Sequence, residues 1–269
     1  MPLEERDWQS LFSVFKSLTG VDLNLYKQEQ LRRRTLGMIE ARGCKDLAEF
    51  AALLKKSPEN VRWFQDKLAI NVSELFRNPE KWAELETKVL PELLQRTTRL
   101  KCWSAGCSYG AEAHSLAAIL EKRFPGNHTV IGTDIDDAAL TQARTGRFSD
   151  ADMRGVPAEY REYFAKVGNV WQASNSIRKY LTFKKANLLT DTYDTGFDLV
   201  MCRNVVIYFN DQAKDDLYQR FFSALKPGGV LFVGSTERIF NSREIGFEQH
   251  LPFFYRKPLQ GDRVWRSAS

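Results

Sequence analysis

The chain has 269 residues, 43% of them hydrophobic, so it can bury a sizeable core in one large domain or two small ones. Its net charge of +5 is mild, which argues against binding nucleic acid by charge and points weakly to an acidic partner. The four cysteines show no Cys-x-x-Cys spacing and no accompanying histidine cluster, so neither a metal site nor a disulfide framework is expected.

The amino-terminal residues are acidic and polar, whereas a signal peptide would begin with basic residues followed by an apolar stretch. No apolar run approaches the length that crosses a membrane. We therefore expect a cytoplasmic protein without membrane insertion.

Helical spacing of apolar residues dominates the first quarter of the chain. Breaks at Gly20, Gly43 and Ser57-Pro58 divide it into short helices, and no strand pattern interrupts them. This pattern predicts a small all-helical domain over residues 1–70.

The helix predicted over residues 26–42 is amphipathic. Its apolar arc is expected to hold Leu31, Leu36, Met38 and Ile39. Arg33 and Arg34 lie opposite, while Arg32 lies within the apolar arc and should snorkel or pair internally. By itself, such a basic face is most simply a solvated helix surface.

Residues 71–99 are predicted to link this domain to the rest, with a capping-type stretch at 71–79 and a helix at 82–94. Strand and helix patterns then alternate over residues 100–269. Such alternation predicts a doubly wound α/β sheet. Its strands are expected at 101–104, 129–133, 181–186, 197–202 and 230–234, its helices include 112–123 and 211–224, and a hairpin at 247–250 and 253–256 closes the sheet.

The segment at about 163–180 breaks this rhythm. It contains short β-like pieces separated by turns where a crossover helix would be expected. We interpret it as a short antiparallel β insertion.

A glycine-rich turn follows the first predicted strand, and the second predicted strand ends in Asp134. A dinucleotide fold would need Gly-x-Gly-x-x-Gly, but Gly106 and Gly110 stand four residues apart, so the tight phosphate cradle is missing. The spacing favours a cofactor without phosphate, such as S-adenosylmethionine, whose ribose hydroxyls would meet Asp134. Taken alone, the two glycines would equally fit a simple strand-to-helix turn.

Arg203 and Asn204 follow the apolar strand at 197–202. The carboxyl ends of parallel strands are where ligands bind in such sheets. Alone, the pair would be most simply interpreted as turn formers. Beside the glycine loop and Asp134, a ligand-binding role is favoured.

Several motifs together resemble one family. They are Asn-Val-Ser-Glu-Leu-Phe-Arg at 71–77, Gly-Ala-Glu-Ala-His-Ser-Leu-Ala at 110–117, Gly-Thr-Asp-Ile-Asp at 132–136, Ala-Asn-Leu-Leu at 186–189, Cys-Arg-Asn-Val-Val-Ile-Tyr-Phe at 202–209 and Leu-Lys-Pro-Gly-Gly-Val-Leu-Phe-Val-Gly-Ser-Thr-Glu at 225–237. Over nearly its whole length the chain resembles the CheR family of chemotaxis-receptor glutamate O-methyltransferases. The resemblance implies a Rossmann-like methyltransferase domain behind a helical amino-terminal domain.

The resemblance also implies roles for individual residues. Cofactor binding would fall to Asn71, Ser73, Arg77, Gly106, Glu112, Asp134, Asn187, Leu188, Arg203 and Asn204. Arg77 and Tyr208 would orient the substrate carboxylate, although Tyr208 could equally be a core aromatic residue. Arg33 and Arg34 would face the acidic methylation region of the receptor.

The implied reaction moves a methyl group from S-adenosylmethionine to receptor glutamates, giving methyl esters for sensory adaptation and S-adenosylhomocysteine as product. An ionised carboxylate attacks directly, so neither a general base nor a metal is expected. The alternatives are a non-catalytic S-adenosylmethionine-binding signalling module, or a methyltransferase with another substrate on the same fold. In some family members the β insertion holds a receptor's carboxyl-terminal pentapeptide. Here it is short, so we expect a monomer that does not require this tether.

Overall fold

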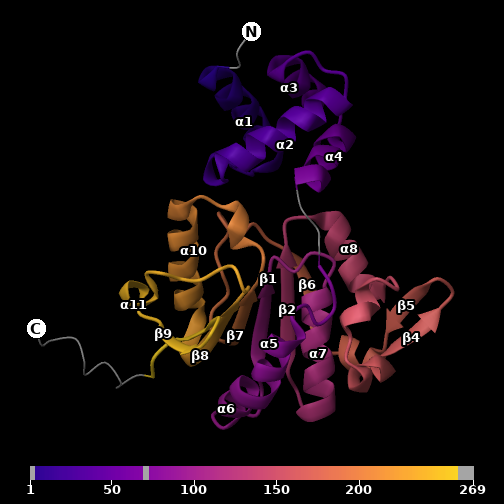
Figure 1. Cartoon of the computed structure of the whole chain (residues 1–269), viewed down its shortest axis with the longest axis vertical. Helices are drawn as coiled ribbons and strands as arrows, with labels where there is room; N and C mark the ends of the chain where they lie inside the picture. The colour runs from indigo at the N-terminus through magenta and orange to yellow at the C-terminus, as the bar shows by residue number, and fades with distance from the viewer. Residues whose placement is uncertain (1–3, 69–72, 260–269) are drawn as a thin grey trace, which may run out of the picture. The chain divides into compact units, whose positions relative to one another are not determined.

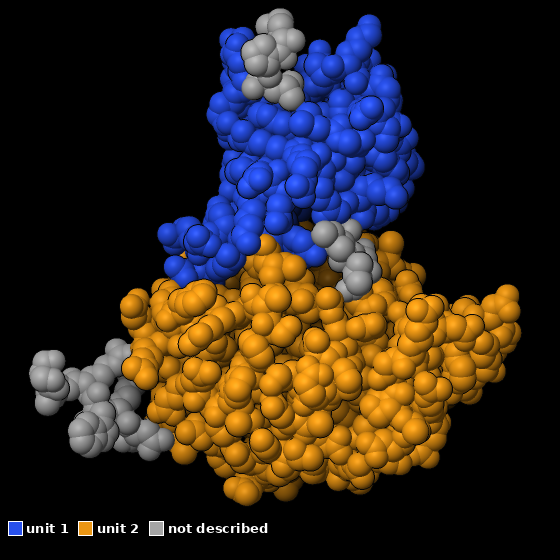
Figure 2. Space-filling view, in the orientation of Figure 1, with its two compact units in different colours: residues 1–71, 208–215 blue, residues 72–207, 216–269 orange. Residues whose placement is uncertain are grey.

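The computed structural model describes residues 4–68 and 73–259. The chain divides into two compact units, one of residues 1–71 and 208–215 and the other of residues 72–207 and 216–269 (Figure 2). No helix in the described part of the chain is both long and apolar enough to cross a membrane.

The first unit is helical, as predicted. Its helices are α1 (Glu5–Thr19), α2 (Gln28–Ala41), α3 (Leu47–Lys56) and α4 (Pro58–Leu68). Phe64 of α4 lies at the centre of the core, where its ring meets those of Phe15 and Phe50 edge-on, each with ring centroids 5.1 Å apart. Such aromatic contacts stabilise the fold by more than the burial of their apolar area alone would.

The later segment 208–215 belongs to this unit through local contacts. The Lys27 N–H donates to the Tyr208 carbonyl at 2.9 Å, and the rings of Tyr26 and Phe209 meet at 5.1 Å. A segment remote in sequence therefore completes the helical unit.

The second unit is built on a seven-stranded sheet in the order β6-β2-β1-β7-β8-β10-β9 (Figure 1). Its first five members pair in parallel, and β10 runs antiparallel to both β8 and β9. The strands are β1 (Lys101–Ala105), β2 (Thr129–Asp134), β6 (Leu181–Lys185), β7 (Phe197–Cys202), β8 (Leu225–Val233), β9 (Glu248–Leu251) and β10 (Phe254–Arg256). The predicted α/β sheet and its closing hairpin are thus confirmed.

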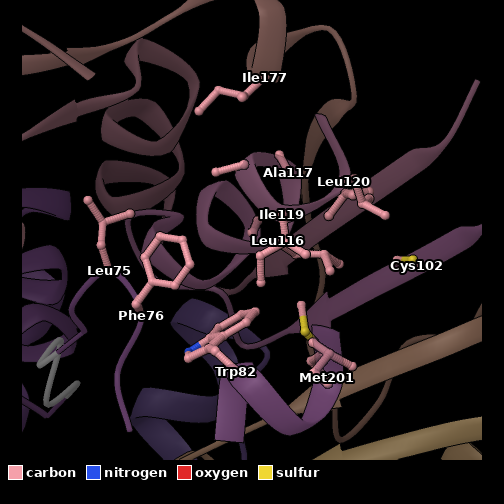
Figure 3. Close-up of a cluster of buried hydrophobic side chains, with 14 of the residues drawn as sticks. Leu75, Phe76, Trp82, Cys102, Leu116, Ala117, Ile119, Leu120, Ile177 and Met201 are labelled. Carbon is pink, nitrogen blue, oxygen red and sulfur yellow. The ribbon is translucent and has the colours of Figure 1, made fainter. Parts of the chain in front are cut away.

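Helices cover both faces of this sheet because alternate residues of each central strand are buried on opposite sides. Cys102 and Met201 face a cluster that includes Leu116 of α7 (Figure 3). On the other face, the ring centroids of Trp103 and of Phe221 in α10 lie 5.4 Å apart. The helices of this unit are α5 (Pro79–Glu84), α6 (Leu90–Leu94), α7 (Ala111–Arg123), α8 (Asp137–Thr145), α9 (Asn175–Arg178), α10 (Asp211–Ala224), whose first residues belong to segment 208–215, and α11 (Ser242–Ile245).

The helix predicted over 82–94 begins earlier, at Pro79, and is divided by a π-helical stretch at Leu85–Val89. Wider helical turns of this kind occur as short interruptions within α-helices. Trp82 of α5 and Phe76, which precedes the helix, pack into the cluster shared with α7 (Figure 3).

The β insertion is a three-stranded antiparallel sheet in the order β3-β5-β4. Its hairpin joins β4 (Phe164–Val167) to β5 (Val170–Ala173) through a two-residue turn with Gly168 at φ 60°. The third strand, β3 (Arg147–Phe148), comes from residues that precede the predicted insertion. A two-residue strand carries too little periodicity to be predicted from sequence.

Candidate active site

The glycine loop at residues 106–110 joins β1 to α7 in a tight conformation. Gly106 and Gly110 have φ values of 75° and 84°. A Cβ atom at Gly106 would lie 2.6 Å from a methyl group of Val205, so only glycine fits there. The N–H groups of Gly106 and Cys107 both donate to the Thr133 carbonyl, at 2.8 and 2.9 Å. The loop is thereby held against the ends of β2 and β7.

Asp134, at the end of β2, stabilises this loop. One carboxylate oxygen accepts from the Ser108 N–H at 2.7 Å and the other accepts from the Asp136 N–H at 3.0 Å. Burial raises the pKa of Asp134, while these backbone N–H groups act in the opposite direction. Each oxygen retains a lone pair with which it could accept from a ligand hydroxyl.

Glu112 lies in the first turn of α7 and reaches back toward the sheet. The Ser104 hydroxyl donates to one of its oxygens at 2.7 Å, and Arg203 approaches the other at 3.7 Å. Burial raises the pKa of Glu112, while the positive charge of Arg203 opposes that shift. A mostly buried carboxylate therefore lies beside the glycine loop.

Arg203, directly after β7, is almost wholly buried, with 3% of its side chain exposed. Its guanidinium donates to the Arg77 carbonyl at 2.8 Å and to the Asn78 side-chain oxygen at 3.0 Å, and lies 4.6 Å from the centre of the Phe232 ring. Its Nε–H is buried and has no hydrogen-bond partner among residues 4–68 and 73–259. Arg203 thus connects Glu112 to the segment that carries Arg77.

That segment, residues 73–78, has an unusual backbone. Phe76 and Asn78 both adopt positive φ values, 53° and 60°, on either side of Arg77. The Phe76 N–H donates to the Ser115 hydroxyl of α7 at 2.8 Å. Positive φ at non-glycine residues costs free energy and persists where surrounding contacts hold it. The half-buried Arg77 side chain therefore projects from a fixed backbone.

Of the remaining cofactor candidates, Ser73 lies in the segment before α5, and Asn187 and Leu188 lie in the loop after β6. Ser73 is held through its carbonyl by the Tyr109 hydroxyl, and Asn71 lies outside the described residues. In the loop after β6, the Asn187 side-chain oxygen accepts from the Leu189 N–H at 3.0 Å. Part of the hydrogen-bonding capacity of the Asn187 amide is therefore used within the loop. The Leu188 carbonyl is held by Tyr193 and Arg220.

Sequence reasoning assigned no role to Glu237, although it ends one of the quoted motifs. It is 4% exposed and accepts four backbone N–H groups, from Asn204, Val205, Val206 and Gly234 at 2.6, 2.9, 3.0 and 2.8 Å. The feature of the sequence that could have indicated a role for Glu237 is the position of this acid shortly after the apolar stretch that forms β8.

The other predicted residues belong to the helical unit. Tyr208 ends the 3₁₀ turn Val206–Tyr208, and Arg33 of α2 is exposed. Arg34 instead donates to the Leu68 carbonyl at 2.8 Å, at the end of α4. Arg32, which was expected to snorkel or to pair internally, pairs with the exposed Glu5 of α1 at 2.7 Å.

The prediction that Leu36 lies on the apolar arc of α2 with Leu31, Met38 and Ile39 was wrong, since Leu36 is 41% exposed. The buried stripe of α2 is Leu31, Thr35, Met38 and Ile39. At 100° per residue, Leu36 lies well outside that stripe, and Thr35 takes the inner position.

Among the described residues, no group of three or more His, Cys, Asp or Glu side chains is placed to hold a metal ion.

Comparison with known proteins gives a consistent result. Residues 6–69 match the family model for the all-alpha domain of CheR methyltransferase, and residues 71–250 match the model for its SAM-binding domain. A chemotaxis protein methyltransferase of Listeria monocytogenes is 38% identical over 96% of this chain and 99% of its own length. Chemotaxis protein methyltransferase 1 of Pseudomonas aeruginosa is 33% identical over 86% of this chain and 90% of its own length.

Proposed function

The chain belongs to the CheR family of S-adenosylmethionine-dependent chemotaxis protein methyltransferases, as its motifs predicted, and from this premise we propose that it methylates glutamate side chains on the cytoplasmic helical bundle of chemotaxis receptors. It acts in the cytoplasm, as a monomer and without a metal. Nucleic acid is not its substrate.

The observation that carries this proposal is the pair of carboxylates beside the glycine loop. Asp134 and Glu112 both retain lone pairs for a ligand, and the spacing of Gly106 and Gly110 differs from that of a dinucleotide phosphate cradle. These groups suit a cofactor with ribose hydroxyls, an ammonium and a sulfonium. Asn187 and Leu188 would lie along its adenine, while Asn71, Ser73, Gly106, Arg203 and Asn204 would complete its surroundings.

The bound cofactor supplies an electrophilic methyl group on a positively charged sulfur. A lone pair of the substrate carboxylate would form the new O–C bond as the C–S bond breaks, and the electrons of the C–S bond would pass to sulfur. No proton moves, so the protein needs no general base. Its contribution is alignment, which we assign to Arg77 and Tyr208 at the carboxylate and to Glu112 and Asp134 at the cofactor.

Transfer of radiolabelled methyl groups to membranes carrying the cognate receptors tests this function. We expect base-labile label on the receptors, and none when their acceptor glutamates are replaced by alanine. A signalling module would bind the cofactor and leave the membranes unlabelled. Label on another class of molecule would instead indicate a different methyltransferase.

The basic face of α2 supports a role in receptor binding. Arg33 is exposed, whereas Arg34 also holds the end of α4, so Arg33→Glu is the cleaner test of charge. We expect this change to raise the KM for receptor several-fold at low salt, with cofactor affinity unchanged, because charge at a binding rim acts mainly on association. Receptor titrations at two salt concentrations measure it.

Lys55→Glu is the matched control, since Lys55 is an exposed residue of α3 and the charge change is the same. If both variants raise the KM for receptor equally, Arg33 contributes only to the overall charge of the protein and not to a specific receptor contact. Reversal of both Arg33 and Arg34 should add a loss of thermal stability from the α4 contact.

We propose that the receptor pentapeptide is not required. The hairpin of the insertion turns in two residues, which leaves no long loop to enclose a peptide on β4. Calorimetry with the carboxyl-terminal peptide should detect no binding at micromolar concentrations. Micromolar affinity would contradict this proposal.

A further inference from the structure

Glu237 was given no role by the family resemblance, yet its carboxylate accepts four backbone hydrogen bonds beside the site. One oxygen accepts from the N–H groups of Asn204 and Gly234, and the other accepts from those of Val205 and Val206. Three of the four donors belong to the turn that follows β7. The fourth lies directly after β8, so this one side chain joins the ends of two neighbouring strands.

The surrounding backbone is shaped to admit this carboxylate. A Cβ atom at Gly234 would lie 2.4 Å from the Glu237 carboxylate and 3.0 Å from the Asn204 nitrogen, so no side chain fits there. Asn204 itself has φ 61°, a left-handed conformation that needs support from its surroundings. A glycine and a strained asparagine thus accompany the buried acid.

Ionised Glu237 is the form that fits these contacts. Burial raises the pKa of Glu237, whereas the four N–H donors act in the opposite direction. Each donor needs an acceptor lone pair, and a carboxylate offers about four. Protonation would replace one acceptor by a donor facing other donors.

The turn held by Glu237 meets the cofactor candidates on both sides. Arg203, which precedes it, approaches Glu112 at 3.7 Å and holds the Arg77 carbonyl. Val205, within it, lies against Gly106 of the glycine loop. A change at Glu237 would therefore reach the loop and the Arg203 contacts together.

We propose that Glu237 is a positioning residue of the cofactor site, whose carboxylate fixes the turn at residues 204–206 and so aligns Asn204, Arg203 and the glycine loop for S-adenosylmethionine. The inference rests on the cofactor site of the proposed function and on no property of the receptor. It assigns Glu237 no contact with the reacting atoms.

Glu237→Gln tests this role because the amide keeps the size of the side chain but directs an NH₂ group at backbone donors. We expect the dissociation constant for S-adenosylhomocysteine to rise about tenfold or more, as buried donors lose their acceptor. The KM for cofactor should rise similarly, while the KM for receptor stays unchanged. Calorimetry and initial-rate kinetics measure these quantities.

Asp198→Asn is the matched control. Asp198 is a buried acid at the opposite end of β7, where it accepts from the Lys101 N–H at 2.8 Å and from the Lys226 ammonium at 2.7 Å. We expect this variant to lose thermal stability and to keep product affinity within about twofold of the wild type. An equal loss of affinity in both variants would overturn the positioning role.

Should Glu237→Gln fail to fold, Glu237→Asp keeps the charge and withdraws the carboxylate by one methylene. It should then weaken product binding, and wild-type affinity in either folded variant would overturn the proposal. If the wild type binds product but labels no receptor, the proposed function fails, while a selective loss of affinity in the Glu237 variants would still support the inference.

Discussion

Arg77→Ala is expected to lower the rate of methyl transfer about a hundredfold or more, because a positioned charged donor at the reacting carboxylate would be lost. The change should leave the fold intact. The structure holds this segment through the Arg77 carbonyl, which accepts from Arg203 at 2.8 Å and from the Trp82 indole at 3.0 Å, and both bonds survive the substitution. Steady-state kinetics at saturating cofactor, with a thermal unfolding curve, measure the effect.

Two further variants define the origin of that effect. Arg77→Lys keeps the positive charge but not the forked geometry, so it should recover only part of the rate. Arg99→Ala removes an exposed arginine whose Nε donates to the Asn127 carbonyl, and should leave turnover unchanged. Near wild-type turnover in Arg77→Ala would remove Arg77 from the catalytic assignment.

Glu112→Gln is expected to weaken cofactor binding by at least about tenfold, because it removes a mostly buried negative charge next to a buried arginine. Burial raises the pKa of Glu112, and the positive charges of Arg203 and Arg77 oppose that shift. Product binding by calorimetry and the cofactor KM report the loss.

The same carboxylate predicts a pH dependence. Burial raises the pKa of Glu112, so as pH falls it gains its proton before an ordinary glutamate does. The ionised form is the one that attracts a cationic cofactor, so wild-type affinity should decrease as pH falls through that raised pKa. In Glu112→Gln this contribution to the pH profile should disappear.

Glu121→Gln provides the control on the same helix. Glu121 pairs with Lys179 at 2.7 Å and accepts from the Tyr180 hydroxyl at 2.6 Å near the far end of α7. The substitution should lower stability slightly and leave both cofactor affinity and its pH profile unchanged. An unaltered affinity in Glu112→Gln would exclude Glu112 from the cofactor site.

Much of the architecture follows from local pattern. Strand and helix periods differ, so their alternation after residue 100 identified the α/β sheet, and the four-residue spacing of Gly106 and Gly110 indicated a cofactor without phosphate. From its angle on one helix, Arg32 was predicted to snorkel or to pair internally, and it contacts Glu5. The helix and strand periods, the glycine spacing and the angle of Arg32 on its helix are set by residues a few positions apart, which a sequence displays directly. The partner of Arg32 is 27 positions away and was not predicted.

Other features depend on residues that only the folded chain brings together. Arg203 holds the carbonyl of Arg77, 126 positions earlier, and Glu237 holds the turn at Asn204, 33 positions earlier. The segment 208–215 joins the helical unit, although in the sequence it lies between β7 and β8 of the sheet. No periodicity encodes such contacts.

By itself, the amino-acid sequence determined the two kinds of domain, the family and the candidate groups around Gly106, Asp134 and Asn204, because helix period, strand alternation and motif spacing are local properties. The tertiary structure alone decided which groups have internal partners: Arg203 with Glu112, Arg34 with the end of α4, and Glu237 with four backbone donors. The physical reason is that parallel strands place their carboxyl ends at one edge irrespective of their separation along the chain. A buried charge at this edge is costly unless it is paired, and the fold decides which residues lie close enough to pair with it.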